Sequence, residues 1–122
     1  MRLVTRGDMD GLVAAVLLTT MENVDSLELI HPQDITDEKF AVRPDDILAN
    51  LPYHPACSLW FDHHEITDSN RKPPAVFNGK HAIMPSFARV VYGYYSSDKL
   101  KRYEPLVAEA ARFDSAQLSV DD

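Results

Sequence analysis

The sequence has only one cysteine, Cys57, among its 122 residues. No disulfide can form within the chain and no cysteine-based zinc cluster can be built, which is typical of proteins from a reducing compartment. Cys57 leads into an apolar segment, where a buried thiol that acts as a small hydrophobic residue is more common than a nucleophile. We therefore expect a cytoplasmic protein in which Cys57 serves packing.

Long apolar runs and a surplus of basic residues are also absent. No segment has the length needed to cross a bilayer, and the first residues carry no signal-peptide pattern, so we expect no membrane partner. The chain has 12 lysine and arginine residues against 19 aspartate and glutamate residues, a net charge of −7. This charge argues against non-specific binding to a nucleic-acid backbone. It remains compatible with a phosphate ligand, because a bound cation reverses the local field.

The apolar residues that are present form short strand-like runs between helix-like segments. We expect strands at 2–5, 26–30, 46–49 and 58–61, and helices at 12–21, about 85–95 and about 103–113. Segment 31–44 reads as irregular, and two prolines predict a loop at 51–55. Strands that alternate with helices or long crossovers predict an α/β fold, an open, mostly parallel, Rossmann-like sheet flanked by helices.

The tripeptide Asp62-His63-His64 follows directly after the strand expected at 58–61. Adjacent residues on an extended segment point in opposite directions, so one histidine can bind a metal while the other faces a substrate. Asp62 can bind the metal directly or orient a histidine. A polar strand exit with solvated histidines is the structural alternative.

A second acidic cluster, Asp8-Met9-Asp10-Gly11, follows the strand expected at 2–5. Carboxylates two residues apart in a turn can converge on one cation or on two adjacent cations. A turn with a helix cap is the structural alternative, with Asp10 as the cap or in the first helical turn. Strand-end carboxylates and histidines from two segments predict a divalent-metal site at the carboxyl edge of the sheet.

Together these motifs resemble the DHH phosphoesterase superfamily, which includes RecJ-type exonucleases, exopolyphosphatases and manganese-dependent pyrophosphatases. The first family motif, a strand followed by Asp-x-Asp, matches Asp8 and Asp10, and the name-giving motif matches 62–64. The segment Asn-Leu-Pro-Tyr-His at 50–54 is most similar to the exopolyphosphatase-related members. The last family carboxylate falls on Asp114, for which a helix-end or capping role is the structural alternative.

The resemblance has two departures. The family places a metal-bridging carboxylate after the strand before the DHH strand, and this chain has Asn50 there. His54 is a candidate replacement ligand or an ordinary loop histidine. Asp45 and Asp46 lie on the wrong side of the strand to substitute. The histidine that some members place four residues before the first carboxylate is Val4 in this chain.

The resemblance implies a metal-dependent phosphohydrolase that cleaves a phosphoanhydride or phosphodiester with metal-activated water, as exopolyphosphatases do. One or two Mn²⁺ or Mg²⁺ ions would be the cofactor. His64 and Arg6 would neutralise phosphate oxygens, although Arg6 can equally be a solvated turn residue. The implied metal ligands are Asp8, Asp10, Asp62, His63 and Asp114.

Two other functions stay open. A degenerate DHH domain would bind a nucleotide or phosphate without catalysis, which Asn50 and Val4 favour. A structural or interaction domain without metal is disfavoured by the two motifs together. The expected ligands are a phosphorylated small molecule, polyphosphate or a short oligonucleotide.

The domain organisation is also predicted from the resemblance. Residues 1–122 correspond to a DHH catalytic-type domain. The carboxyl-terminal DHH-associated domain of the family, with its glycine-rich and basic substrate motif, has no counterpart in this sequence. We therefore expect the chain to be the amino-terminal part of a longer protein, and we leave open a homodimer.

Overall fold

The protein has a single five-stranded sheet in the order β2-β1-β3-β4-β5. The computed structural model describes residues 1–66 and 72–121, with side chains up to Arg112. Every described strand pair is parallel, which confirms the predicted α/β class. The strands are β1 (Arg2–Thr5), β2 (Ser26–Leu29), β3 (Asp46–Ala49), β4 (Leu59–Asp62) and β5 (Gly79–His81).

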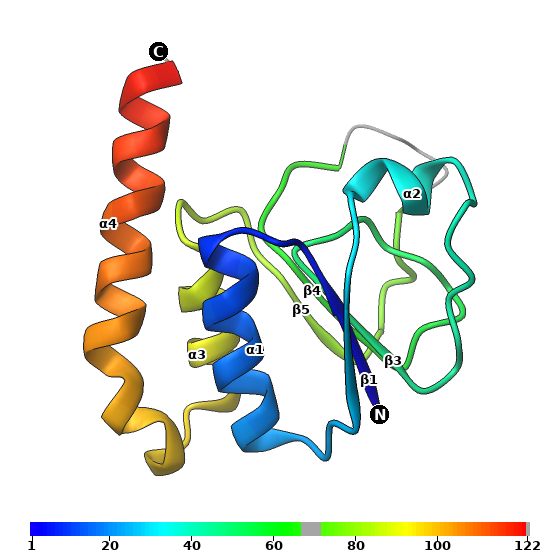
Figure 1. The fold of residues 1–122 in the computed structure, drawn as a ribbon, viewed down its shortest axis with the longest axis horizontal. Coiled ribbons are helices and arrows are strands. Elements are labelled where there is room, and N and C mark those ends of the chain that lie inside the picture. The colour runs from blue at the N-terminus through cyan, green and yellow to red at the C-terminus, as the bar shows by residue number, and fades with distance from the viewer. Residues whose placement is uncertain (67–71, 122) are drawn as a thin grey trace.

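Helices cover the two faces of the sheet unequally (Figure 1). On one face, α1 (Met9–Met21) and α3 (Phe87–Tyr95) lie against the strands, and the 3₁₀ helix η2 (Asp98–Tyr103) and α4 (Glu104–Asp121) pack on these two helices. The other face carries only the short α2 (Pro32–Thr36) and the loops around it. No helix among the described residues is long and apolar enough to cross a membrane.

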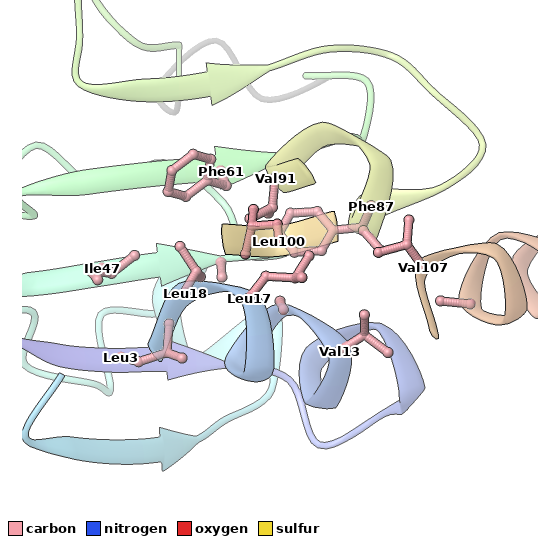
Figure 2. Packing of buried hydrophobic residues seen from close by; sticks show 14 residues of the cluster. Leu3, Val13, Leu17, Leu18, Ile47, Phe61, Phe87, Val91, Leu100 and Val107 are labelled. Carbon is pink, nitrogen blue, oxygen red and sulfur yellow. The ribbon is translucent and has the colours of Figure 1, made fainter. Parts of the chain in front are cut away.

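Side chains alternate between the two faces along each central strand, as a pleated strand requires. Leu3, Ile47 and Phe61 point toward the helical layer and form its buried cluster (Figure 2). Val4, Leu48 and Trp60 point the other way and pack with loop residues. The core therefore forms on both faces, and Val4 is one of its fully buried residues.

At the amino edge of the sheet, where the strands begin, the first residues of β1 and β3 form a buried ion pair. Arg2 Nε donates to Asp46 Oδ1 at 2.7 Å, and Arg2 Nη2 donates to Asp46 Oδ2 at 2.6 Å. Asp46 is fully buried and Arg2 is 8% exposed. The hydrogen bonds to Asp46 raise the pKa of the Arg2 guanidinium. Asp46 thus lies at the edge opposite the predicted site, which agrees with its exclusion as a metal ligand.

Several predicted element boundaries differ from the observed ones. Helix α1 begins at Met9 rather than residue 12, because Asp8 caps it. Segment 31–44 contains α2, which a capping box between His31 and Asp34 stabilises. The last helix extends to Asp121 instead of ending near 113. Strand β5 was not predicted, since Gly-Lys-His lacks the β-branched and apolar residues typical of strands. The loop at 51–55 is confirmed.

The strand order creates a topological switch point between β1 and β3. The chain leaves β1 toward β2 on one side, and the later strands continue on the other side. In open parallel sheets, ligands bind in the crevice at the carboxyl ends of the strands at this point. Those ends carry Arg6 after β1, Asn50 after β3 and His63 after β4.

Candidate functional site

The turn after β1 is held by the side chain of Asp8. Its Oδ1 accepts a hydrogen bond from the Gly11 amide at 2.9 Å, which caps α1, and its Oδ2 lies 3.4 Å from Arg6 Nε. Gly11 is buried, and an added Cβ would lie 1.8 Å from the Arg6 carbonyl oxygen, so only glycine lets the helix approach this turn. Asp10 lies in the first turn of α1, one of its two expected places. Asp8 therefore has the capping role of the structural alternative.

Asn50 ends β3 in an unusual environment. Its φ of 60° is left-handed, a conformation that asparagine tolerates better than most residues. The backbone N–H of Asn50 donates a hydrogen bond to the Phe61 carbonyl at 2.9 Å, and the residue is 2% exposed. Among the described residues, no group donates a hydrogen bond to its buried Oδ1. A buried acceptor without a donor costs free energy, so Asn50 Oδ1 is an energetically unfavourable feature at this end of the sheet.

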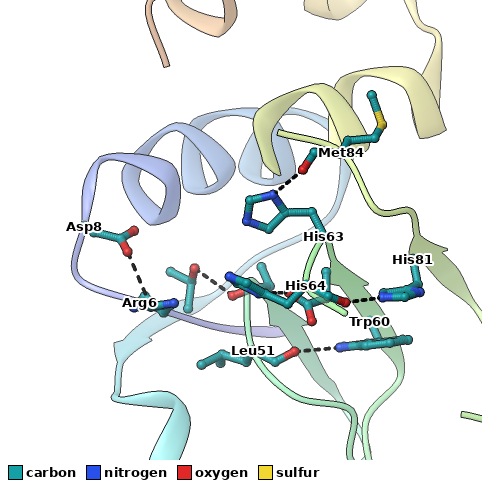
Figure 3. Close-up of polar contacts among 11 residues, drawn as sticks. Arg6, Asp8, Leu51, Trp60, His63, His64, His81 and Met84 are labelled. Atoms are coloured by element: carbon teal, nitrogen blue, oxygen red, sulfur yellow. Dashed lines mark hydrogen bonds and ion pairs between the residues drawn. The ribbon is translucent and has the colours of Figure 1, made fainter. Parts of the chain in front are cut away.

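The DHH tripeptide forms a small hydrogen-bonded unit after β4 (Figure 3). Asp62 is 4% exposed, and its Oδ1 accepts from His64 Nδ1 at 2.7 Å. His63 Nδ1 lies 2.8 Å from the Met84 carbonyl oxygen, and because a carbonyl only accepts, this nitrogen carries the proton. Asp62 likewise only accepts here, so His64 also carries a proton on Nδ1.

The two histidine rings do not point in opposite directions as predicted. Their centroids are 4.4 Å apart with an interplanar angle of 62°. The prediction assumed a continuing extended segment, but β4 ends at Asp62 and the chain bends at His64. The bend brings His64 back onto Asp62, so Asp62 orients a histidine as one of its two expected roles.

A pocket of about 340 Å³ lies where these strand ends meet. Arg6, Asn50, Asp62 and His64, all predicted site residues, line it together. Its remaining walls come from α2, β4, the loop after β3 and the segment after the DHH tripeptide, and they include Pro32, Thr36, Pro52, Tyr53, Trp60, Glu65 and Ile66. Burial raises the pKa of the Tyr53 phenol, so this side chain stays uncharged.

Other predicted site residues lie outside this pocket. His54 Nδ1 accepts from the Ala56 amide at 3.1 Å, and His54 Nε2 lies 3.3 Å from Glu38. His54 is therefore engaged within its loop and does not line the pocket. Asp8 borders a shallower neighbouring depression that also includes Arg6. Asp114 belongs to α4, but its side chain lies outside the described residues.

The residue types at this edge fit a divalent cation, since carboxylates and imidazoles are the usual ligands of Mn²⁺ and carboxylates those of Mg²⁺. Their arrangement is less complete. Among the described side chains, no group of three or more histidine, cysteine, aspartate or glutamate residues is placed to hold a metal ion. Two of the candidate carboxylates already accept hydrogen bonds within the protein. Asp8 accepts from the Gly11 backbone N–H, and Asp62 accepts from His64 Nδ1.

The sequence did not reveal the role of His81. Its Nε2 donates to the His64 carbonyl at 2.6 Å, and its ring stacks on Trp60 with centroids 5.2 Å apart and an angle of 8°. Trp60 Nε1 in turn donates to the Leu51 carbonyl at 2.8 Å. His81 and Trp60 thus connect the DHH turn to the loop that follows Asn50. Nothing in the sequence indicated this role, because His81 belongs to the unpredicted strand β5, where it pairs with Asp62.

Comparison with known proteins shows a similarity to a solved structure. No protein-family model matches the chain, and no curated protein matches it. A solved structure, the pGpG-specific phosphodiesterase PggH from Vibrio cholerae, is similar with a TM-score of 0.78 and 38% sequence identity. The match covers 95% of this chain and 37% of that protein, so the chain spans little more than a third of its structural relative.

Proposed function

We propose that this chain is the catalytic part of a phosphoesterase that cleaves a phosphodiester bond in a short linear nucleotide. The observation that carries the proposal is the Asp62–His64 hydrogen bond of 2.7 Å at the carboxyl end of β4, in the pocket that Arg6 also lines. It places an oriented imidazole beside Arg6 in one pocket. The similarity to a pGpG-specific phosphodiesterase supports the same reaction class and makes a dinucleotide the first substrate to test.

The side chains divide the chemistry between them. Asp62 holds the His64 Nδ1 proton, which leaves Nε2 able to take a proton from the attacking water or to deliver one to the leaving oxygen. Arg6 supplies positive charge for the phosphate oxygens as negative charge builds on them. His63, whose Nδ1 donates to the Met84 carbonyl, follows β4 at the same edge of the sheet.

The proposed function includes a divalent cation, Mn²⁺ or Mg²⁺. Asp8, Asp10, Asp62 and His63 are the residues that would hold one or two ions, together with Asp114. When bound, such an ion lowers the pKa of a coordinated water and neutralises phosphate charge. The carboxylates and imidazoles at the ends of β1 and β4 support this choice of ligands.

The experiment is a hydrolysis assay of the chain with the dinucleotide pGpG, with polyphosphate and with an unrelated phosphodiester, each in Mn²⁺, in Mg²⁺ and in a chelator. We expect dinucleotide cleavage that depends on the metal and is lost in His64→Gln. A matched control is His54→Gln, which changes a histidine outside the pocket. Equal turnover in His64→Gln and in the unchanged chain would contradict the assignment.

A second candidate function is phosphate or nucleotide binding without turnover. Asn50 favours it, because an amide carries no charge and bridges two cations poorly. The lack of a three-ligand group among the described side chains points the same way. Tight dinucleotide binding with no product in any metal would support this candidate over hydrolysis.

A further inference from the structure

A second hollow lies on the helical side of the sheet, at its β5 edge. Its volume is about 430 Å³, and it shares no lining residue with the pocket of Arg6 and His64. One wall comes from β5 and the segment that follows it, and the other comes from α3. Lys80 of β5 pairs in register with Phe61, whose side chain belongs to the helical cluster, so Lys80 points toward the side of α3.

This hollow is lined by two cations without a counter-ion. Lys80 and Arg89 both line it, and both are exposed. None of its lining residues is an aspartate or a glutamate, and no carboxylate of the described residues forms an ion pair with either side chain. In a chain with a net charge of −7, positive charge is thus left uncompensated at this place. Two cations that share a hollow attract an anionic group.

Gly93 and Tyr94 give the hollow its shape. An added Cβ at Gly93 would have no packing partner within 4 Å, so open space lies on this side of α3. Gly93 stands four residues after Arg89, and residues four apart share a helix face. Tyr94 is 42% exposed, and its ring packs at 80° against Phe61 with centroids 5.0 Å apart. A ring that is packed on one side and open on the other can stack with a flat group.

Cations beside an aromatic ring suit a phosphate that is attached to a flat organic body. The guanidinium of Arg89 can donate two parallel hydrogen bonds to phosphate oxygens, and the ammonium of Lys80 adds a point charge. Basic groups bind the phosphates of nucleotides in proteins, while aromatic side chains stack with the bases.

We propose that this hollow binds a nucleoside monophosphate, with the phosphate between Lys80 and Arg89 and the base on Tyr94. The proposal goes beyond the proposed function, because it assigns a second ligand site outside the pocket of the DHH turn. The two sites are connected through Met84, which lines the hollow and whose carbonyl accepts a hydrogen bond from His63 Nδ1 (Figure 3).

The test is an NMR titration of the chain with AMP in a chelator, followed at the backbone amides of Gly93 and Tyr94. Adenosine and inorganic phosphate are the comparison probes. We expect both amides to shift in a saturable way, and AMP to bind at least about tenfold more tightly than either probe, because only AMP uses both parts of the hollow. The double variant Lys80→Gln/Arg89→Gln should weaken AMP by about tenfold or more.

Three further variants locate the site. Gly93→Leu fills the hollow and suits a helix, so the variant should fold and lose AMP binding. The double variant Lys99→Gln/Arg102→Gln removes the same charges from exposed positions on η2 and should leave AMP affinity unchanged. His64→Gln alters the other pocket and should leave the Gly93 response unchanged, so the result is independent of hydrolysis.

The outcomes that overturn the proposal are equally specific. No AMP-dependent shift at Gly93 and Tyr94, or equal AMP affinity in Lys80→Gln/Arg89→Gln and the unchanged chain, overturns the site. Equal affinity for AMP and inorganic phosphate overturns the assignment of the base. Loss of the Gly93 response in His64→Gln would place AMP in the other pocket and would also overturn the proposal.

Discussion

The amino and carboxyl edges of the parallel sheet differ in how their polar side chains are paired and exposed. At the amino edge, Arg2 and Asp46 are buried and bound to each other by two short hydrogen bonds. At the carboxyl edge, Asn50 adopts a left-handed conformation, and none of the described residues donates a hydrogen bond to its Oδ1. His64, on the same edge, keeps about half of its side chain exposed. The amino edge thus pairs two buried charges with each other, whereas the carboxyl edge keeps an exposed imidazole oriented by a buried carboxylate. We expect substitutions at the first edge to change stability and substitutions at the second to change activity.

The largest effect is expected at the carboxyl edge, in catalysis. Asp62→Asn keeps the shape of the side chain but no longer holds the proton on His64 Nδ1. We expect hydrolysis to fall by roughly 10²- to 10⁴-fold while the fold is retained. The measurement is the turnover number beside a urea unfolding curve. A large loss of stability with normal turnover per folded molecule would reverse our comparison of the edges.

The amino edge should respond in stability alone. Asp46→Ala leaves the buried Arg2 guanidinium without its partner, and we expect the free energy of unfolding to fall by about 3–5 kcal/mol. Asp25→Ala is the control, because it removes an exposed ion pair with the amino terminus and should cost less than about 1 kcal/mol. Similar unfolding curves for the two variants would refute the special role of the buried pair.

The comparison can be sharpened at residue 50 with Asn50→Asp, since aspartate also tolerates the left-handed backbone conformation found there. Without metal, Asn50→Asp places a charge at a buried position, and we expect a loss of about 1–3 kcal/mol in unfolding free energy. Mn²⁺ should restore this stability and bind with higher stoichiometry, as measured by thermal unfolding and calorimetry. A lower metal stoichiometry in Asn50→Asp would rule out a bridging position at residue 50.

The smallest effect concerns Cys57, which lies two residues before β4. Burial raises its thiol pKa to about 11, so the reactive thiolate is rare at pH 8. Iodoacetamide should label the folded chain slowly and the urea-unfolded chain quickly, as mass spectrometry would follow. Because the folded pKa lies above the unfolded value, this thiol favours folding below roughly pH 8.5, and that contribution is lost as the pH rises toward 11. Equal labelling rates would show that the thiol is accessible.

The comparison of edges also explains what the sequence could reveal. Strands β1 and β3 were predicted with their observed bounds, because short apolar runs between turns are local signals. The tripeptide 62–64 was found because its residues are adjacent in sequence. His81 and the hydrogen-bond deficit of Asn50 were missed, since each depends on contacts between distant segments. The hydrogen bonds of Asp62 likewise require the bend at His64, which no residue pattern encoded.

Gly11 has a consequence for how this protein can vary. An added Cβ would collide with the Arg6 carbonyl oxygen at 1.8 Å, and that oxygen belongs to the backbone of the turn that positions Asp8. Every amino acid reached from a glycine codon by a single base change has a Cβ. No one-step missense mutation at this codon can therefore be neutral. We expect the turn after β1 to keep this glycine while surrounding positions change.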